Sequence, residues 1–562
     1  MTKKEPGEAA VPADDSVEFV GKGTDETGAH FAQFAVNGTK LAPTPFASIA
    51  NRDGFFGSLN AAGAKLFQIS SRQRFLAKIE ASSPRDTFIV ATRVGWHSGT
   101  SFVLPGRILG QSRVELQQSL GHLPPEMLTK FGEEGTLQEW QSQILPLCAG
   151  NSRFIFAVCA AFASSVATLL PEAKATGGFQ FFGEPESGKT TAAIVAGSVW
   201  GNHLPPDVDN GFLEVWHSTA AKLADTLAAH ADVGLVLDEL SYFSGDVHQA
   251  VMQIASGAGR QRLNQIGRIT YRCFVLSTSN KPLWQYPGSV GVSLGAVLSR
   301  LTDIPVPTGG AGIFEALHEF ANGSELADAL TSMCHAQHGT AGPAFIEAIL
   351  NSERDTISKR ARRFRARYKK RLTALAESEN LKPLKRPLDR FATVYAAGRL
   401  ASELGIISWS KQEVREAVLS CHLDALRVAS VALPGTQASA GVSASASIRL
   451  LDYLKKHRRD FLDLDRTPLT APRGFGSAPG YIAKMKGQTW WYFPAERFKE
   501  IAGGSRPARE LMSRLRAHRL APKGKDLTVQ RPIFRGKKGN KGWRRVVAIR
   551  ARSLKRYRKL LE

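Results

Sequence analysis

The segment 183–190, Gly-Glu-Pro-Glu-Ser-Gly-Lys-Thr, constrains the fold of this chain more than any other. It fits the pattern G-x-x-x-x-G-K-[ST], a loop that binds nucleotide phosphates. Glycines let the backbone approach the phosphates, and N–H groups at the start of the next helix face the anion. Residues 178–182 (GFQFF) before the loop are typical of a strand, and residues 191–200 after it are typical of a helix. This context favours a nucleoside triphosphate site over a Gly-rich turn that precedes an ordinary helix.

We therefore expect ATP and Mg²⁺ as the cofactors of the chain. Lys189 would reach the β- and γ-phosphates, and the Thr190 hydroxyl would bind the metal ion. The residues predicted to surround the nucleotide are Gly183, Glu184, Pro185, Glu186, Ser187, Gly188, Lys189, Thr190 and Thr191.

Two adjacent carboxylates end the apolar run 233–240 (VGLVLDEL). Such a run suits a parallel strand that is covered on both faces. Asp238 would complete the Mg²⁺ site, usually through water, and Glu239 would orient and deprotonate the attacking water. Asp238 follows the loop lysine by 49 positions. The pair of acids therefore favours a hydrolase site over a strand that merely ends in solvated acids.

Two further residues are candidates for the chemistry. The run 273–278 (CFVLST) reads as a strand that ends at Asn280, which could position the attacking water, although Asn is also common in turns. Arg300, in the stretch 298–303 (LSRLTD), is a candidate arginine finger, whose planar fork stabilises charge on a transferred phosphoryl group. The alternative for Arg300 is a surface ion pair. A finger at this position usually acts on a neighbour's nucleotide, so we expect a homo-oligomeric ring, most simply a hexamer.

The positive charge of the chain is concentrated near its C-terminal end. The 562 residues carry a formal net charge of +23. Residues 451–562 hold 30 Lys and Arg against 9 Asp and Glu, whereas the first 450 hold 43 against 41. Such a focused field is typical of a module that binds a polyanion, and its binding should weaken steeply with salt.

This basic region has the pattern of a folded winged helix rather than of a disordered tail. Its expected helices are 447–461, 494–502 and 506–519, and its expected strands are a pair within 481–493, then 527–534 and 543–550. The Gly-rich stretch 535–542 would be the wing, and helix 506–519 would face a DNA groove. The predicted DNA contacts are Arg509, Arg514, Arg516, Lys537, Lys538 and Lys541.

Two other basic segments leave alternatives open. Residues 257–272 read as a β-hairpin with its tip at 264–268, which could grip DNA inside a ring or pack against a neighbouring subunit. For the DNA reading, the predicted contacts are Arg262, Gln265 and Arg268. Residues 359–371 (KRARRFRARYKKR) read as a solvated helix that could touch nucleic acid or only face solvent.

The expected organisation is an α/β P-loop core with a parallel sheet, flanked by other parts. The expected ranges are a disordered tail at 1–18, a mostly β domain at 19–145, the ATPase core at 146–350, a helical segment at 351–440 and the basic winged-helix-like domain at 441–562. The uncharged stretch 154–170 suits a core helix better than a membrane span. Five scattered cysteines and a polar N-terminal segment indicate a cytoplasmic protein.

The chain resembles the bacterial helicase-like ATPases catalogued as domain of unknown function 927, which are related to ring helicases of the minichromosome-maintenance (AAA+) type. The resemblance spans roughly residues 19–423. It is carried by Gly95-Trp96, 102–106, 178–191, 216–219, 237–240, Ser256-Gly257-x-Gly259-Arg260-x-Arg262 and 390–409. In the related helicases the finger lies in Ser-Arg-Phe-Asp. Here the stretch lacks the Phe, and Asp303 comes one place later.

The resemblance implies an ATP-dependent DNA helicase or translocase that acts in the replication of a mobile element or phage, of either 3′–5′ or unassigned polarity. One rival is an origin-binding initiator or loader in which ATP is mainly an assembly switch. It predicts slow hydrolysis and selective duplex binding, whereas a helicase predicts stimulation by single strands. The other rival is a defence or packaging ATPase that does not unwind, since a fold hosts many functions.

Overall fold

The computed structural model describes residues 16–551 apart from 83, 85, 98, 111–114, 119–126, 171, 174–175, 203–210, 217–219, 259–269, 288–291, 308–310, 434–440, 467–477, 486, 503, 519, 523–525 and 536–540. The described residues form two compact units. One comprises those of 1–374 and 384–428, and the other those of 375–383 and 429–562.

The first unit begins with a mixed sheet of order β3-β2-β1-β5-β9. β1 (Val17–Asp25) and β2 (His30–Val36) form an antiparallel hairpin, and the Asp25 carboxylate accepts hydrogen bonds from the turn N–H groups of Thr27 and Ala29. β5 and β9 continue the sheet in parallel. The remaining strands are β3 (Thr39–Lys40), β4 (Thr44–Pro45), β5 (Asp86–Ala91) and β9 (Glu115–Gln118).

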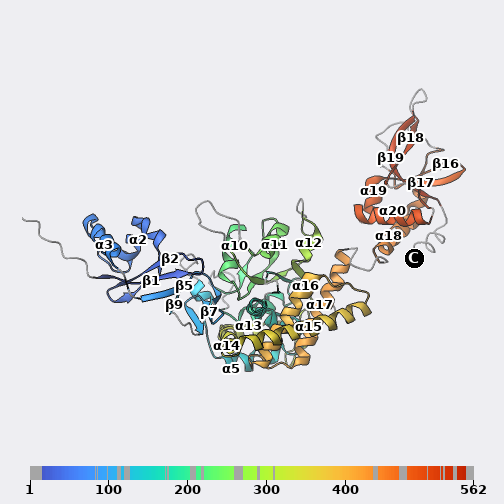
Figure 1. Cartoon of the computed structure of the whole chain (residues 1–562). Coiled ribbons are helices and arrows are strands. Elements are labelled where there is room, and N and C mark those ends of the chain that lie inside the picture. The colour runs from blue at the N-terminus through green and yellow to red at the C-terminus, as the bar shows by residue number, and fades with distance from the viewer. Residues whose placement is uncertain are drawn as a thin grey trace, which may run out of the picture. The chain divides into compact units, whose positions relative to one another are not determined.

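Three helices make this region mixed α/β, so the expectation of a mostly β domain is wrong. They are α1 (Phe46–Ala50), α2 (Arg52–Ala61) and α3 (Ile69–Ala81). Phe55 and Phe75, from α2 and α3, pack on Phe34 of β2, and Figure 1 shows both helices together beside the sheet. Helices α2 and α3 bury only a narrow apolar stripe, because most of their other positions are polar or exposed.

A small antiparallel sheet joins this region to the core. It consists of β6 (Gly95–His97), β7 (Ser101–Leu104) and β8 (Arg107–Gly110). The Phe102 ring stacks on Trp200 of the core at 6.2 Å. Three short helices follow, namely α4 (Met127–Lys130), α5 (Leu137–Gln143) and α6 (Leu145–Cys148).

The centre of the first unit is a five-stranded parallel sheet of order β11-β12-β13-β10-β14. Its strands are β10 (Thr176–Phe182), β11 (Glu214–Val215), β12 (Leu235–Asp238), β13 (Cys273–Ser279) and β14 (Leu301–Pro305). Because β12, β13 and β10 are neighbours and parallel, their carboxyl ends lie together along one side of the sheet, which we call its carboxyl edge. Ligands bind at this edge in open parallel sheets.

Helices bury both faces of this sheet, as the continuous apolar character of the strands requires. The helices of this part, which pack on the sheet or on one another, are α7 (Ser152–Ala161), α8 (Ala163–Thr168), α9 (Lys189–Gly197), α10 (Ala220–Ala229), α11 (Val247–Ser256), α12 (Leu294–Leu298), α13 (Gly323–Ala336), α14 (Ala341–Leu350), α15 (Arg354–Ser378), α16 (Lys385–Glu403) and α17 (Lys411–Ala432). The uncharged stretch 154–170 forms the buried helices α7 and α8, as the core interpretation predicts. In the part of the chain that the structure describes, no helix has the length and apolar character needed to span a bilayer.

The second unit contains the helices and strands expected for the basic region. Its elements are α18 (Gly441–His457), β15 (Leu462–Asp463), β16 (Tyr481–Met485), β17 (Gln488–Pro494), α19 (Ala495–Ala502), α20 (Ser505–Ala517), β18 (Val529–Arg535) and β19 (Lys541–Arg550). The sheet has the order β15-β16-β17-β19-β18. Leu511, Met512 and Leu515 of α20 are buried in one core with Phe493 and Val547 of the sheet, as their helical spacing predicts.

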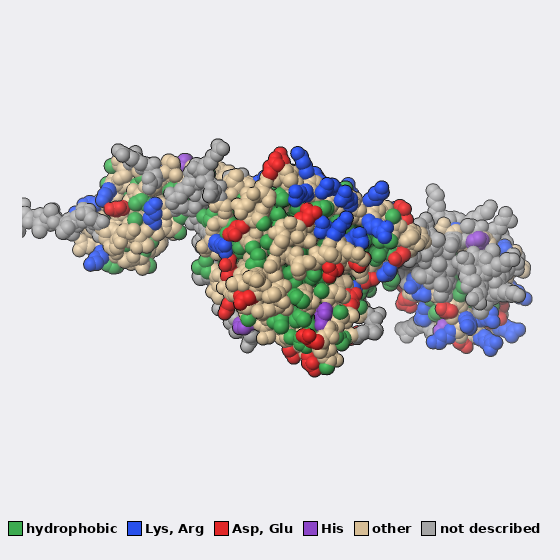
Figure 2. All heavy atoms as spheres, turned by 90° about the horizontal axis from the view of Figure 1, so that it is seen from below, with side chains coloured by type: hydrophobic (Ala, Val, Ile, Leu, Met, Phe, Trp, Pro, Cys, Tyr) green, Lys and Arg blue, Asp and Glu red, His purple; other side chains and the backbone are tan. Residues whose placement is uncertain are grey.

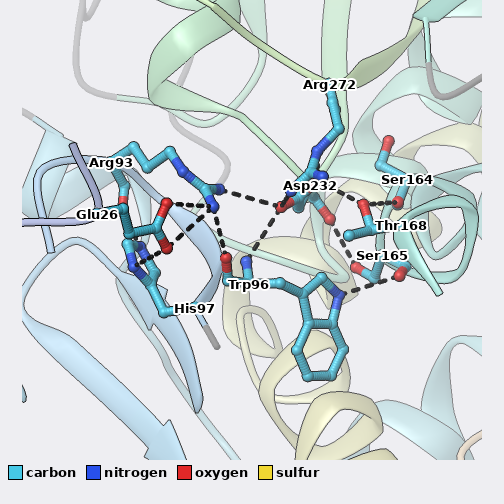
Figure 3. Close-up of polar contacts among 9 residues, drawn as sticks. All are labelled: Glu26, Arg93, Trp96, His97, Ser164, Ser165, Thr168, Asp232 and Arg272. Atoms are coloured by element: carbon cyan, nitrogen blue, oxygen red, sulfur yellow. Dashed lines mark hydrogen bonds and ion pairs between the residues drawn. The ribbon is translucent and has the colours of Figure 1, made fainter. Parts of the chain in front are cut away.

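A buried carboxylate, Asp232, holds the base of the core sheet to the small sheet (Figure 3). It lies just before β12 and is fully buried. Its oxygens accept hydrogen bonds from the Trp96 N–H at 3.0 Å, the Thr168 hydroxyl at 2.6 Å, and the Arg272 guanidinium at 2.8 and 3.0 Å. Arg93 Nη1 lies 3.6 Å from the same carboxylate. One side chain thus joins four segments that are distant in sequence.

We expect Asp232→Asn to destabilise the fold by roughly 2–4 kcal/mol, because it leaves a buried network without its charge and puts an amide where donors point. The urea midpoint of unfolding, followed by tryptophan fluorescence, should fall. Asp328→Asn, which changes an exposed acid on α13, is the matched control and should keep the wild-type midpoint. Equal midpoints for all three proteins would contradict the structural role of Asp232.

Candidate nucleotide site

The loop between β10 and α9 has the geometry of a phosphate-binding loop. Gly188, the N-cap of α9, has φ +85°, and a Cβ there would lie 2.6 Å from Ile313 Cγ2. Lys189 is buried, and its Nζ donates to the carbonyls of Gly183 (3.1 Å) and Glu184 (2.6 Å) and to Ser187 Oγ (3.3 Å). The ammonium is therefore held inside the curl of the loop, where phosphate oxygens would replace these acceptors.

Asp238 lies at the carboxyl end of β12 and faces Thr190. The Thr190 hydroxyl is 3.1 and 3.3 Å from the two carboxylate oxygens, and Thr278 of β13 also donates its hydroxyl to Asp238. Burial raises the pKa of Asp238, and the hydrogen bonds from Thr278 and Thr190 oppose that shift. Burial lowers the pKa of Lys189, while Glu239, Asp238 and Glu184 act in the opposite direction.

Glu239 is held in a fixed orientation beside Asn280. Asn280 Nδ2 donates to Glu239 Oε2 at 3.1 Å, and the Ser241 N–H donates to Oε1 at 3.2 Å. The backbone of Glu239 has φ +52°, a conformation that is unfavourable for a side-chain-bearing residue, and its N–H donates to Thr278 Oγ1 at 2.8 Å. Backbone strain of this kind is concentrated at functional sites.

The phosphate loop, Glu239 and Asn280 line one cavity of about 560 Å³, within the range of small-molecule sites. One part of its lining contains Glu239 and Asn280, and another comes from the segment 311–327. The lining residues are Pro185, Glu186, Ser187, Gly188, Lys189, Thr190, Thr191, Glu239, Asn280, Ala311, Phe314, Gly323, Ser324 and Ala327. The structure therefore brings most of the predicted nucleotide residues together with two of the predicted catalytic ones.

The residues present fit both expected groups. A loop of N–H groups with a buried ammonium suits a polyphosphate, and Thr190 and Asp238 offer the hard oxygen ligands that Mg²⁺ prefers. The cavity also leaves room beyond the loop, against the Phe314 ring and the first turn of α13.

Arg300 lies at the amino-terminal ends of the parallel strands, whereas the cavity lies at their carboxyl ends. It immediately precedes β14, and its carbonyl accepts the Gly178 N–H at 2.8 Å, near the start of β10. From Gly178 to Phe182, where the phosphate loop begins, β10 runs roughly 13 Å. Arg300 instead lines a cavity of about 100 Å³ with Arg386, Asp389 and Arg390. Burial, together with Arg386, lowers the pKa of Arg300.

The Asp303 side chain is held inside the fold by hydrogen bonds. It is buried on β14, where its carboxyl group accepts hydrogen bonds from the Leu283 N–H and from Gln180 Nε2, both at 2.9 Å. Burial raises its pKa to about 8, although these two hydrogen bonds act against the shift.

The predicted DNA contacts are placed unevenly. Arg262, Gln265, Arg268, Lys537 and Lys538 lie outside the described residues. The flanks of the predicted hairpin at 257–272 approach each other through an antiparallel bridge between Ala258 and Thr270.

On the second unit, Arg509 is exposed on α20, Arg514 belongs to the same helix, and Lys541 begins β19. Arg516 has local partners, because its guanidinium donates to the carbonyls of Pro522 and Asp526. These bonds use donors that a DNA contact would need.

Sequence reasoning missed four residues of the site. Thr278 bridges Asp238 and Glu239, and Ser241 contacts Glu239. Phe314 and Ser324 line the cavity from a segment more than a hundred residues after the loop. The only available signal was a hydroxyl residue near the end of β13, the strand beside β12. Ser277 and Ser279 carry this signal as well as Thr278 does.

The structure is similar to a solved structure described as "SCCmec type IV Cch - active helicase". The match has a TM-score of 0.64 and 16% identity, and it covers 98% of this chain and 95% of that chain. At this identity the likeness shows a shared α/β fold with a P-loop-like core. A second match, "The A form apo structure of NrS-1 C terminal region-CTR", has a TM-score of only 0.26 at 11% identity, with 61% of this chain and 68% of that chain covered.

Residues 48–272, less than half of the chain, match the family model described as Domain of unknown function (DUF927), which bears out the resemblance that the sequence motifs indicated. No curated protein matches the sequence of the chain.

Proposed function

We propose that this protein is an ATP-driven DNA helicase or translocase that works as a homo-oligomeric ring, in the replication of a mobile element or phage. The observation that carries the proposal is the meeting of Lys189, Thr190, Asp238, Glu239 and Asn280 at the carboxyl ends of β10, β12 and β13. These groups are the ones that nucleotide hydrolysis requires, each within reach of the next.

In this mechanism Lys189 exchanges its loop carbonyls for the β- and γ-phosphates, and the loop N–H groups bind the remaining phosphate oxygens. Thr190 and Asp238 would hold Mg²⁺, which neutralises charge on the phosphates when it is bound. Asn280 and Glu239 bind the attacking water between them, and Glu239 accepts its proton. Phe314 offers the base an apolar face, and the Ser324 hydroxyl lines the same cavity.

The position of Arg300 supports the ring. In its own chain Arg300 lies away from the cavity, which supports a role at the nucleotide of a neighbouring subunit. A head-to-tail contact of this kind forms a ring when its rotation closes. We propose a hexamer of AAA+ type in which Arg300 of each subunit completes the nucleotide site of its neighbour. The domain limits are those expected from the sequence, and the protein would act in the cytoplasm.

DNA would bind through the 257–272 hairpin and the second unit. The order of helices and strands in that unit, with α20 before the β18–β19 pair, supports a winged helix with 535–542 as the wing. The charge of residues 451–562 supports a polyanionic partner. The competing function is an ATP-switched origin-binding initiator or loader, which the same basic unit would serve.

The deciding experiment is ATP hydrolysis by the full chain without DNA, with single-stranded DNA and with duplex DNA, and with Lys189→Ala as the blank. We expect at least about tenfold stimulation by single strands, and no hydrolysis above background in the variant, because Lys189 binds the transferred phosphoryl group. Slow turnover that ignores single strands, together with tight duplex binding, would instead support the initiator. Hydrolysis that survives Lys189→Ala would overturn the site itself.

A further inference from the structure

Helix α15 has two faces of opposite character. Its apolar side chains lie buried at helical spacing against the rest of the first unit. They are Ile357, Ala361, Phe364, Tyr368 and Leu372. Between Asp355 and Glu377 the helix carries nine basic residues and no acidic residue. The opposite face is therefore exposed and strongly positive.

Acids from other elements neutralise four of these nine residues. Arg360 lies 3.7 Å from Glu403, and Arg362 lies 3.2 Å from Glu172. Arg365, which is buried, pairs with Glu172 and Asp389, and Lys369 also pairs with Asp389. The fold therefore supplies carboxylates along the flanks of α15.

The other five basic residues form what we call the basic stripe: Lys359, Arg363, Arg367, Lys370 and Arg371. All five are exposed, and none forms an ion pair with a carboxylate in the part of the chain that the structure describes. Residues 359, 363, 367 and 371 recur every four positions, so the stripe follows one side of the helix for roughly 18 Å. Figure 2 shows Lys and Arg side chains gathered on the central body, within the span that α15 and α16 occupy in Figure 1.

An isolated stripe of this kind is unfavourable, since like charges four residues apart on a helix repel each other. A polyanion laid along the stripe would relieve this repulsion. Arginine, which provides three of the five side chains, has a planar fork that matches phosphate oxygens. A membrane-surface helix would need an exposed apolar face, and the apolar face of α15 is buried in the protein.

We propose that the basic stripe of α15 binds the sugar–phosphate backbone of a nucleic acid strand. This surface lies in the same unit as the nucleotide site and adds to the hairpin and the second unit, on which the proposed function relies. In this proposal the stripe binds nucleic acid without nucleotide. The proposal can therefore be tested separately from the hydrolysis mechanism.

Two double variants of the full chain test the proposal. Arg363→Gln/Arg367→Gln removes two unpaired charges of the stripe. The matched control, Arg360→Gln/Arg362→Gln, removes two arginines of the same helix that already have acidic partners. Affinity for a labelled thymidine oligonucleotide is measured without nucleotide over a range of salt concentrations, and thermal melting verifies that both variants are folded.

For the stripe variant we expect weaker binding at every salt concentration, and a log–log salt slope that is shallower by roughly 1.4, or 0.7 for each lost phosphate contact. The control should keep the wild-type affinity within about twofold, and basal ATP hydrolysis should be unchanged in both variants. Equal losses in the two variants, or no loss in either, would overturn the proposal. So would a stripe variant that keeps its DNA affinity but loses binding to vesicles of anionic phospholipid, because the partner would then be a membrane.

Discussion

Glu239→Gln should bind ATP with an affinity close to that of the wild type and hydrolyse it about 10²–10⁴-fold more slowly, the usual contribution of a general base. The amide keeps the size of the side chain and can still accept a hydrogen bond from Asn280 Nδ2 through its oxygen. It cannot take the proton of the attacking water. Lys189 and Thr190, which hold the phosphates and the metal ion in our proposal, are untouched by the change.

Single-turnover hydrolysis and the binding of a fluorescent ATP analogue separate the two effects. Glu186→Gln is the matched control, because it makes the same chemical change on an exposed side chain of the phosphate loop, where only the backbone is proposed to act. A Glu239→Gln protein that turns over at the normal rate would show that another group activates the water. Loss of ATP binding would show that Glu239 supports the site rather than the reaction.

Arg300→Ala should lower hydrolysis by about 10³–10⁵-fold, the contribution of an arginine finger, while each subunit keeps its own nucleotide affinity. The physical reason is the separation of Arg300 from the cavity of its own chain by the length of β10. In our proposal a finger at that position acts across a subunit boundary.

Mixing variants tests the direction of action. Arg300→Ala has an intact nucleotide site without a finger, and Lys189→Ala has an intact finger beside an inactive site. When the two proteins are co-assembled, the Arg300→Ala sites that meet a Lys189→Ala neighbour should regain hydrolysis that neither protein shows alone. Each variant mixed with itself is the control. Assembly of mixed rings without any recovered activity would contradict a finger in trans.

Motifs at strand ends were the most predictable part of the site. Lys189, Asp238 and Asn280 each follow a recognisable apolar run, and parallel strands with a shared edge bring such ends together. The contacts of Thr278 could not be predicted in the same way. They depend on the register between β12 and β13, which pairs Leu237 with Ser277 and sets Thr278 beside Asp238.

The N-terminal region was harder to interpret because its signals are short. Helices α2 and α3 bury few residues each, so their sequences lack a long helical period, and alternating runs nearby suggested strands instead. In the second unit the periodic positions of α20 were sufficient, and Leu511 and Leu515 are buried as predicted. The carbonyl partners of Arg516 lie in the segment after the helix, and no pattern within the helix indicates them.

The Asp232 cluster bears on how the protein could be cut into pieces. A fragment that starts at residue 146 would contain the whole parallel sheet and the phosphate loop. It would lack Trp96 and Arg93, two of the partners of the buried Asp232 carboxylate. The aspartate sits three residues before β12, and its partner Arg272 directly precedes β13, the strands that carry Asp238 and Asn280 toward the nucleotide. A minimal expressible fragment that keeps the candidate nucleotide site should therefore begin before Arg93.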